Sequence, residues 1–139
     1  KRLALKVHEN DKYGDDPYSV HLHGVYRTYI WLYGEHEAKG VIGLIFAHDM
    51  IEDHSWTESL LYDIGCPEEY IDVLNVLNKR NYYSNSNYLE NIASVGGVAL
   101  KIKIADTIYN RDQCHKDGDE KRVKYYNGRL KMLKSVDNF

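Results

Sequence analysis

Apolar residues that recur at intervals of three and four positions constrain this chain more than any other feature. Such spacing is typical of amphipathic helices whose apolar stripe faces a core. The clearest stretch runs from 18 to 32, with Tyr18, Leu22, Val25, Tyr29 and Leu32 on one face. No stretch alternates for long enough to indicate a β-strand. The pattern therefore predicts an all-α fold, an irregular helical bundle, and the 139 residues form one domain, residues 1–139.

The expected helices are separated by glycine, proline and polar segments. They cover 20–32, 38–51, 57–64, 67–77, about 88–92, a stretch after Gly96-Gly97 that includes Asp106, and 119–133. Thr57 and Pro67 suit helix starts, and Gly65 suits a helix end. The segment 79–87 is rich in Asn, Ser and Tyr, and its composition predicts a polar loop.

An ionisable pair interrupts the apolar stripe of the helix expected over 38–51. After Val41, Leu44 and Ile45, the next position on the stripe is His48, and Asp49 follows it. An imidazole or a carboxylate is costly to bury without a partner. One explanation is a core histidine that bonds to the backbone beside a solvated acidic helix end. The other is a metal site, because a metal ion takes neutral imidazole and ionised carboxylate together.

Two more of the expected helices carry a similar anomaly. Asp106 lies between Ile102 and Tyr109 in the spacing of a core-facing stripe, and His21 lies beside the stripe of 18–32. A lone Asp in such a place could instead cap a helix or form a salt bridge. Three helices that each bring a His or an Asp toward the core favour a shared metal site.

The residue types indicate which metals would suit this site. Two histidines and two aspartates offer nitrogen and oxygen ligands. Such a mixed set predicts a site for a divalent transition metal such as Mn, Fe or Co and not a closed zinc site with thiolate ligands. Cys66 and Cys114 lack CxxC spacing, so neither a disulfide framework nor a thiolate site is expected. We expect Mn²⁺ first, with Fe²⁺, Co²⁺ or Zn²⁺ as alternatives.

Three motifs, in this order, resemble the H…HD…D signature of the HD-domain metal-dependent phosphohydrolases. They are 17–21 (PYSVH, for P-Y-x-x-H), 48–53 (HDMIED, for H-D-x-x-E-D) and 103–110 (KIADTIYN, for K-L-A-D-x-x-x-N). Within that superfamily, the chain most resembles the SpoT-type and small alarmone hydrolases and related small stand-alone HD proteins of bacteria and phages. The likeness covers about residues 8–113, and it implies an HD-domain helical bundle.

The resemblance also implies a role for each matching residue. The metal ligands would be His21, His48, Asp49 and Asp106. Glu52 and Asp53 would be catalytic, because in this family the acidic pair orients or deprotonates the attacking water and later protonates the leaving group. Contacts to the substrate are expected from five further residues: Asn110, Lys12, Arg80, Tyr88 and Lys103.

We therefore expect a phosphohydrolase in which metal-activated water attacks a phosphoryl group of a nucleotide. Removal of the 3′-pyrophosphate from (p)ppGpp ranks first, although Asp11 and Thr107 stand where the alarmone hydrolases have arginine. A nucleotidase or dNTP phosphohydrolase of the HD superfamily is the alternative. A non-catalytic nucleotide-binding module ranks third.

Composition narrows the expected partners and location. The formal net charge of −3 at pH 7 supplies no overall basic field for polymeric nucleic acid. No apolar run approaches the ~20 residues of a transmembrane helix, so we expect no membrane insertion and a cytoplasmic location. The expected partner is a small-molecule nucleotide substrate. The sequence is also compatible with assembly into a homo-oligomer.

Overall fold

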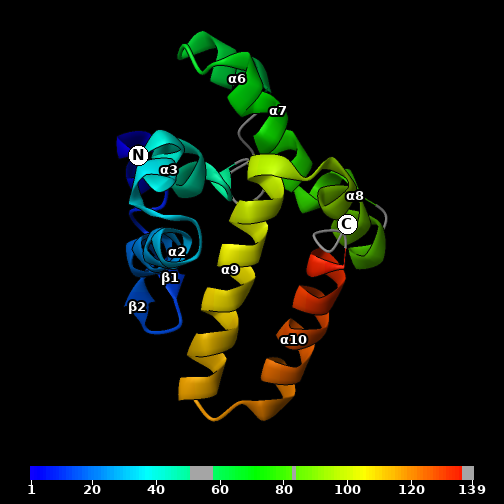
Figure 1. The fold of residues 1–139 in the computed structure, drawn as a ribbon. Coiled ribbons are helices and arrows are strands. Elements are labelled where there is room, and N and C mark those ends of the chain that lie inside the picture. Colours follow the sequence, from blue (N-terminus) through cyan, green and yellow to red (C-terminus); the bar gives the residue numbers. More distant parts are fainter. Residues whose placement is uncertain (51–57, 83, 136–139) are drawn as a thin grey trace.

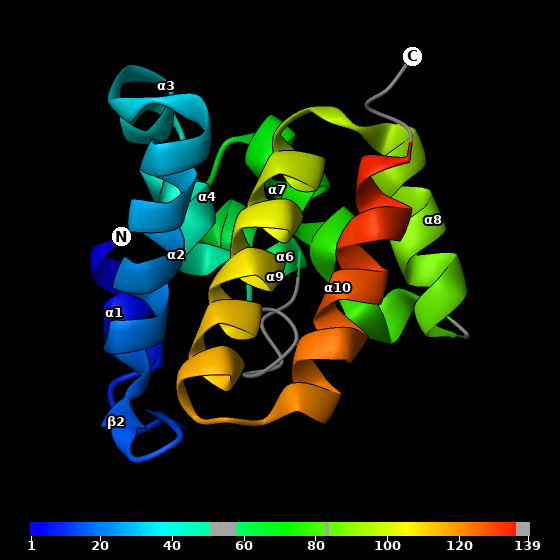
Figure 2. The ribbon, with the colours of Figure 1, turned by 60° about the horizontal axis from the view of Figure 1, so that its bottom comes forward.

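The helix that carries Asp106 forms the centre of the fold in the computed structural model, which describes residues 1–50, 58–82 and 84–135, without the side chains of Arg80 and Asn85. This helix, α9 (Gly97–Lys116), has buried residues on most of its circumference. A helix that is apolar on several sides needs neighbours on several sides. Accordingly, α2 (Tyr18–Tyr33) and α10 (Glu120–Lys134) flank α9, and α7 (Glu68–Leu77) and α8 (Asn85–Val95) also pack against it (Figures 1 and 2).

The remaining elements are short and complete an all-α domain, as the sequence predicts. They are α1 (Arg2–Val7), α3 (Glu35–Gly40), α4 (Ile42–Ala47), α6 (Glu58–Asp63), the 3-10 helix η1 (Lys79–Asn81) and two strands, β1 (Lys12–Tyr13) and β2 (Asp16–Pro17). The strands form a two-residue antiparallel hairpin that the sequence did not predict. Its turn contains Gly14 at φ +62°, a left-handed conformation that glycine adopts without strain. Within the described ranges, no helix is both long and apolar enough to cross a bilayer.

The prediction of one continuous helix over 38–51 is wrong. Gly40 ends α3, Val41 adopts φ −122° and ψ 16°, and α4 then runs only from Ile42 to Ala47. Two glycines within four positions, Gly40 and Gly43, lower the helix propensity of this stretch, which explains why it breaks without a proline. His48 is consequently the C-cap of α4, and Asp49 lies in the turn that follows.

Three other expected boundaries shift by a few residues. Pro67 precedes α7 as its N-cap instead of occupying the first helical position, while Ile71, Leu74 and Leu77 are buried as predicted. The expected loop over 79–87 is shorter than predicted, because η1 occupies its start and α8 begins at Asn85. Ser84 caps α8 by accepting a hydrogen bond from the backbone N–H of Asn87.

The contact between α2 and α9 depends on a glycine. A Cβ atom built on Gly24 would lie 2.1 Å from Cε2 of Tyr109, far inside normal contact distance. The missing side chain therefore lets the Tyr109 ring lie directly on α2. The same ring lies edge-on to His21, one turn earlier in α2, with 5.4 Å between the ring centroids. Close packing of α2 on α9 thus positions a histidine predicted to be functional.

Candidate metal centre

The fold brings together the four residues predicted as metal ligands. His21 comes from α2, His48 and Asp49 from the end of α4, and Asp106 from the middle of α9. Oδ1 of Asp106 lies 3.1 Å from Nε2 of His21 and 3.5 Å from Nε2 of His48. Oδ2 of Asp49 lies 3.1 Å from Nε2 of His48 and 4.0 Å from Nε2 of His21. His21, His48 and Asp106 are buried, and Asp49 is partly exposed.

The orientation of the His48 ring is fixed by the end of α4. Its Nδ1 donates a hydrogen bond of 2.5 Å to the carbonyl oxygen of Ile45, one of the last four carbonyls of the helix, which lack partners within it. Because Nδ1 carries the donated proton, a neutral ring presents the lone pair of Nε2 to the carboxylates of Asp49 and Asp106. A lone pair that faces two carboxylates in a buried place requires a cation between them, either a proton or a metal ion.

The charges around His48 agree with this requirement. Burial of the ring disfavours its protonation, but the carboxylates of Asp49 and Asp106 outweigh burial and raise the pKa of His48 well above its usual value. Burial likewise disfavours ionisation of Asp49, yet the adjacent His48 keeps the pKa of that carboxyl below its usual value. The arrangement therefore attracts positive charge to the space between the three side chains.

Neighbouring side chains hold the carboxylates in place. The hydroxyl of Tyr18 donates a short hydrogen bond to Oδ2 of Asp49. Nζ of Lys103 lies 3.3 Å from Oδ2 of Asp106, and Nδ2 of Asn110 donates to Oδ1 at 3.5 Å. Burial opposes ionisation of Asp106, but Lys103 together with His21 and His48 outweighs burial and keeps the pKa of the carboxyl well below its usual value. These contacts resemble the outer partners that orient metal ligands in general.

Aromatic rings enclose His21. The ring of Tyr13 stacks on it with 4.6 Å between centroids and an interplanar angle of 25°, and Tyr109 covers its edge. Nδ1 of His21 is buried, and no residue that the structure describes offers it a hydrogen bond. The ring is thus held by packing, with Nε2 directed toward Asp106.

The side chains present fit a divalent metal ion. Ligand atoms of His21, His48 and Asp49 lie within 4.8 Å of one another. Bonds from nitrogen or carboxylate oxygen to a zinc-like ion are about 2.0–2.2 Å, so two ligands of one ion lie at most about 4.4 Å apart. The four separations around the histidine nitrogens, 3.1 to 4.0 Å, fall within this limit. The buried group of His21, His48 and Asp49 could therefore hold a metal ion.

A polar cavity of about 190 Å³ opens beside this centre. Asp49 and Asp106 form part of its wall, which joins it to the candidate metal ligands. Three predicted substrate contacts, Tyr88, Lys103 and Asn110, also line it. Tyr88 has a structural role as well, since its hydroxyl donates a 2.7 Å hydrogen bond to the carbonyl oxygen of Leu77.

The structure does not bring every predicted residue to the site. Lys12 is exposed on β1 and is not part of the wall of this cavity. Glu52 and Asp53, the predicted catalytic pair, lie outside the described residues, as does the side chain of Arg80. The backbone of Arg80 belongs to η1, directly after Lys79, whose side chain does line the cavity.

Several side chains at the site were not predicted from sequence. Tyr18 shares a face of α2 with His21, three positions away, so the spacing offered a usable indication. Three cavity residues, Tyr125, Tyr126 and Arg129, come from α10. No motif marks them, because only the packing of α10 along α9 brings them to the cavity.

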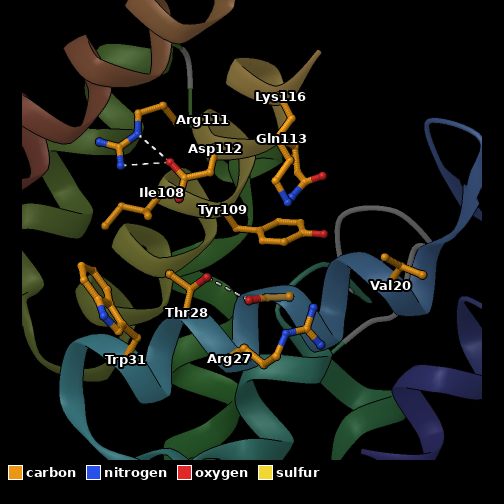
Figure 3. A pocket seen from close by; sticks show the side chains of 11 residues that line it. Val20, Arg27, Thr28, Trp31, Ile108, Tyr109, Arg111, Asp112, Gln113 and Lys116 are labelled. Atoms are coloured by element: carbon orange, nitrogen blue, oxygen red, sulfur yellow. Dashed lines mark hydrogen bonds and ion pairs between the residues drawn. The ribbon is translucent and has the colours of Figure 1, made fainter. Parts of the chain in front are cut away.

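A larger hollow, of about 580 Å³, lies between α2 and α9 and contains none of the candidate metal ligands (Figure 3). Trp31, Arg27 and Lys116 border it, and Arg111 is paired there with Asp112 at 3.1 Å. Its size alone does not make it the functional site. The smaller cavity is lined by three cations and by two of the candidate metal ligands, Asp49 and Asp106, so it is the stronger candidate for the functional site.

Comparison with known proteins adds no family assignment, since no family model matches the chain and no curated protein matches it significantly.

Proposed function

We propose that this chain is a metal-dependent phosphohydrolase that acts on a nucleotide. One observation carries the proposal: the cluster of two histidines and two aspartates and a cavity lined by three cations share Asp49 and Asp106. A site that can hold a metal ion therefore adjoins a space suited to phosphate oxygens. The HD-type order of His21, His48-Asp49 and Asp106 in the sequence supports the same class.

In this proposal His21, His48, Asp49 and Asp106 hold the ion, with Mn²⁺ as the first candidate. A bound divalent ion makes water more acidic and polarises the phosphoryl group. Other residues of the chain orient the metal ligands and supply charge for the substrate. Tyr18 fixes Asp49 through its hydroxyl, and Lys103 adds a positive charge at the cavity wall.

The proton transfers are assigned to the acidic pair that follows the His-Asp dipeptide. Glu52 or Asp53 takes a proton from the attacking water and returns one to the leaving oxygen. This assignment rests on the resemblance to the alarmone hydrolases. Substitution of Glu52 or Asp53 by its amide would lower kcat and leave metal affinity nearly unchanged.

The size of the cavity indicates which end of a nucleotide it takes. Pockets for whole small molecules of drug size are about 300–1,000 Å³. A cavity of about 190 Å³ therefore suits the phosphate end. A second hollow of about 350 Å³ shares Asn110 and Tyr126 with it and offers room for the nucleoside. Removal of the 3′-pyrophosphate from (p)ppGpp is the first candidate reaction, on the strength of the sequence motifs.

One observation favours the second candidate, a nucleotidase or dNTP phosphohydrolase. The second hollow is lined by three carboxylates, Asp15, Asp16 and Asp117, against one cation, Arg122. Such a wall disfavours a second group of phosphates on the nucleoside, which an alarmone carries and an ordinary nucleotide lacks. Hydroxyl and amino groups, which donate hydrogen bonds, suit it better.

The test is release of phosphate and pyrophosphate from a nucleotide panel with added Mn²⁺. The panel contains guanosine tetraphosphate, the common nucleoside mono- and triphosphates and their deoxy forms. Asp49→Ala should abolish release, and Asp72→Ala, at an exposed position of α7, should not. Pyrophosphate from the alarmone alone would select the first candidate, and phosphate or triphosphate from ordinary nucleotides the second. A folded, metal-loaded protein that releases nothing from the panel would overturn the proposed hydrolysis.

A further inference from the structure

The wall of the cavity beside the candidate metal centre collects cations from three separate elements. Lys79 comes from η1, Lys103 from α9 and Arg129 from α10. Asp49 and Asp106 are the carboxylates on this wall. A divalent ion bound to those carboxylates would offset their charge and leave the three cations facing the cavity. An anion is the ligand that such a wall favours.

The cations also repel one another. Lys103 and Arg129 line the same cavity, and Nζ of Lys103 is paired with Oδ2 of Asp106 at 3.3 Å. Two like charges that face one cavity are stabilised together when an anion lies between them.

Arg129 is held in an orientation suited to this task. Its Nη1 donates a 2.6 Å hydrogen bond to the hydroxyl of Tyr125, one turn earlier in α10, and its guanidinium lies over the Tyr125 ring at 5.2 Å. An arginine has five N–H donors in a fixed plane, and a phosphate group accepts two of them side by side. A tyrosine that fixes the guanidinium reduces the conformational entropy lost on binding.

We propose that Arg129 is a phosphate-binding residue, and that α10 thereby recognises the phosphoryl or pyrophosphoryl end of the substrate in the cavity beside Asp49 and Asp106. This inference rests on the proposed function for the identity of the ligand as a nucleotide. It assigns to α10 a contact that no motif in the sequence indicates. Arg129 binds the oxygens that do not react and takes no part in proton transfer.

The test is binding of inorganic phosphate and pyrophosphate to the whole chain, by calorimetry, with and without Mn²⁺. Loss of a charged hydrogen-bonding partner should weaken binding by about ten- to a hundred-fold in Arg129→Ala. Arg129→Lys keeps the charge without the planar pair of donors, so its affinity for phosphate should lie between those of the wild type and Arg129→Ala. Lys131→Ala removes the same charge from an exposed position of α10 and should bind as the wild type does.

A kinetic measurement separates this inference from the proposed function. With a hydrolysed substrate, Arg129→Ala should raise KM more than it lowers kcat, because the lost contact is already made in the bound ground state. Unchanged phosphate binding and KM in a folded Arg129→Ala protein would overturn the inference while leaving hydrolysis intact. Conversely, a protein that binds phosphate through Arg129 but hydrolyses no nucleotide would keep the inference and remove the proposed function.

Discussion

Gly24→Ala gives the sharpest test of how α2 packs on α9. The added Cβ would lie 2.1, 2.3 and 2.8 Å from three ring atoms of Tyr109, whereas carbon atoms in contact are normally about 3.5–4.0 Å apart. Either the helices separate or the ring, which is only 8% exposed, rotates out of its place. Overpacking of this kind costs about 1–3 kcal/mol, and a clash this deep belongs at the upper end.

Helix propensity acts in the opposite direction. Alanine within a helix is favoured over glycine by about 1 kcal/mol, so the net loss of unfolding free energy should be about 2 kcal/mol. For a chain of this size that corresponds to a decrease in Tm of roughly 6–10 °C. Urea unfolding followed by circular dichroism measures the first quantity, and a thermal scan the second.

Gly128→Ala is the matched control for this change. Gly128 lies within α10, and a Cβ there would meet nothing within 4 Å. The same substitution should therefore raise stability by up to about 1 kcal/mol. If Gly24→Ala proved as stable as the wild type, or if both substitutions stabilised the protein equally, the conclusion that the Tyr109 ring packs directly on α2 at Gly24 would be refuted.

Three further outcomes follow from the site and from the helix caps. Tyr18→Phe removes the hydroxyl that holds Asp49 and should weaken Mn²⁺ binding by about 10- to 100-fold in a calorimetric titration. Because the pKa of His48 in the metal-free protein is raised, protons should compete with Mn²⁺ for this histidine already above pH ~6.5. The affinity for Mn²⁺ should therefore fall as the pH is lowered through that pKa. An Mn²⁺ affinity that stays constant from pH 8 to 6 would contradict this prediction. Ser84→Ala should lower the unfolding free energy by about 1 kcal/mol through loss of the α8 cap, while Ser94→Ala, exposed on the same helix, should be nearly neutral in urea unfolding.

Much of the helical framework follows from apolar spacing alone. The spacing around Asp106 predicted a core-facing stripe, and Ala99, Ile102, Asp106 and Tyr109 are all buried in α9. This prediction holds because a long buried helix has many positions that repeat the same period. The spacing placed His48 on an apolar stripe and His21 beside one, and both side chains are buried.

The segment around His48 shows where such reasoning stops. Its apolar residues fit one helix, yet the helix is interrupted at Val41, and α4 ends at Ala47. Short helices are held mainly by tertiary contacts, so their ends depend on neighbours that are distant in sequence. The placement of His48 at a helix end, where it bonds to the Ile45 carbonyl, could not be derived from periodicity.

The cavity was still less accessible from sequence. Tyr125 and Arg129 are spaced as neighbours on a helix, but that spacing is equally typical of a solvated face. Only the position of α10 beside α9 brings them near Asp106. Sequence motifs therefore predicted the candidate metal ligands, whereas the residues that line the cavity around them became visible only in the three-dimensional structure.

The most direct test of the account is a titration of the metal-free protein with Co²⁺ and Mn²⁺, followed by absorption and calorimetry. We predict one equivalent of tightly bound metal, lost in His48→Ala and retained in His115→Ala, which changes a histidine that is 72% exposed. Circular dichroism establishes that both variants are folded. A wild-type protein that binds no metal, or a folded His48→Ala protein that binds it equally well, would contradict the assignment of a metal centre to His21, His48, Asp49 and Asp106.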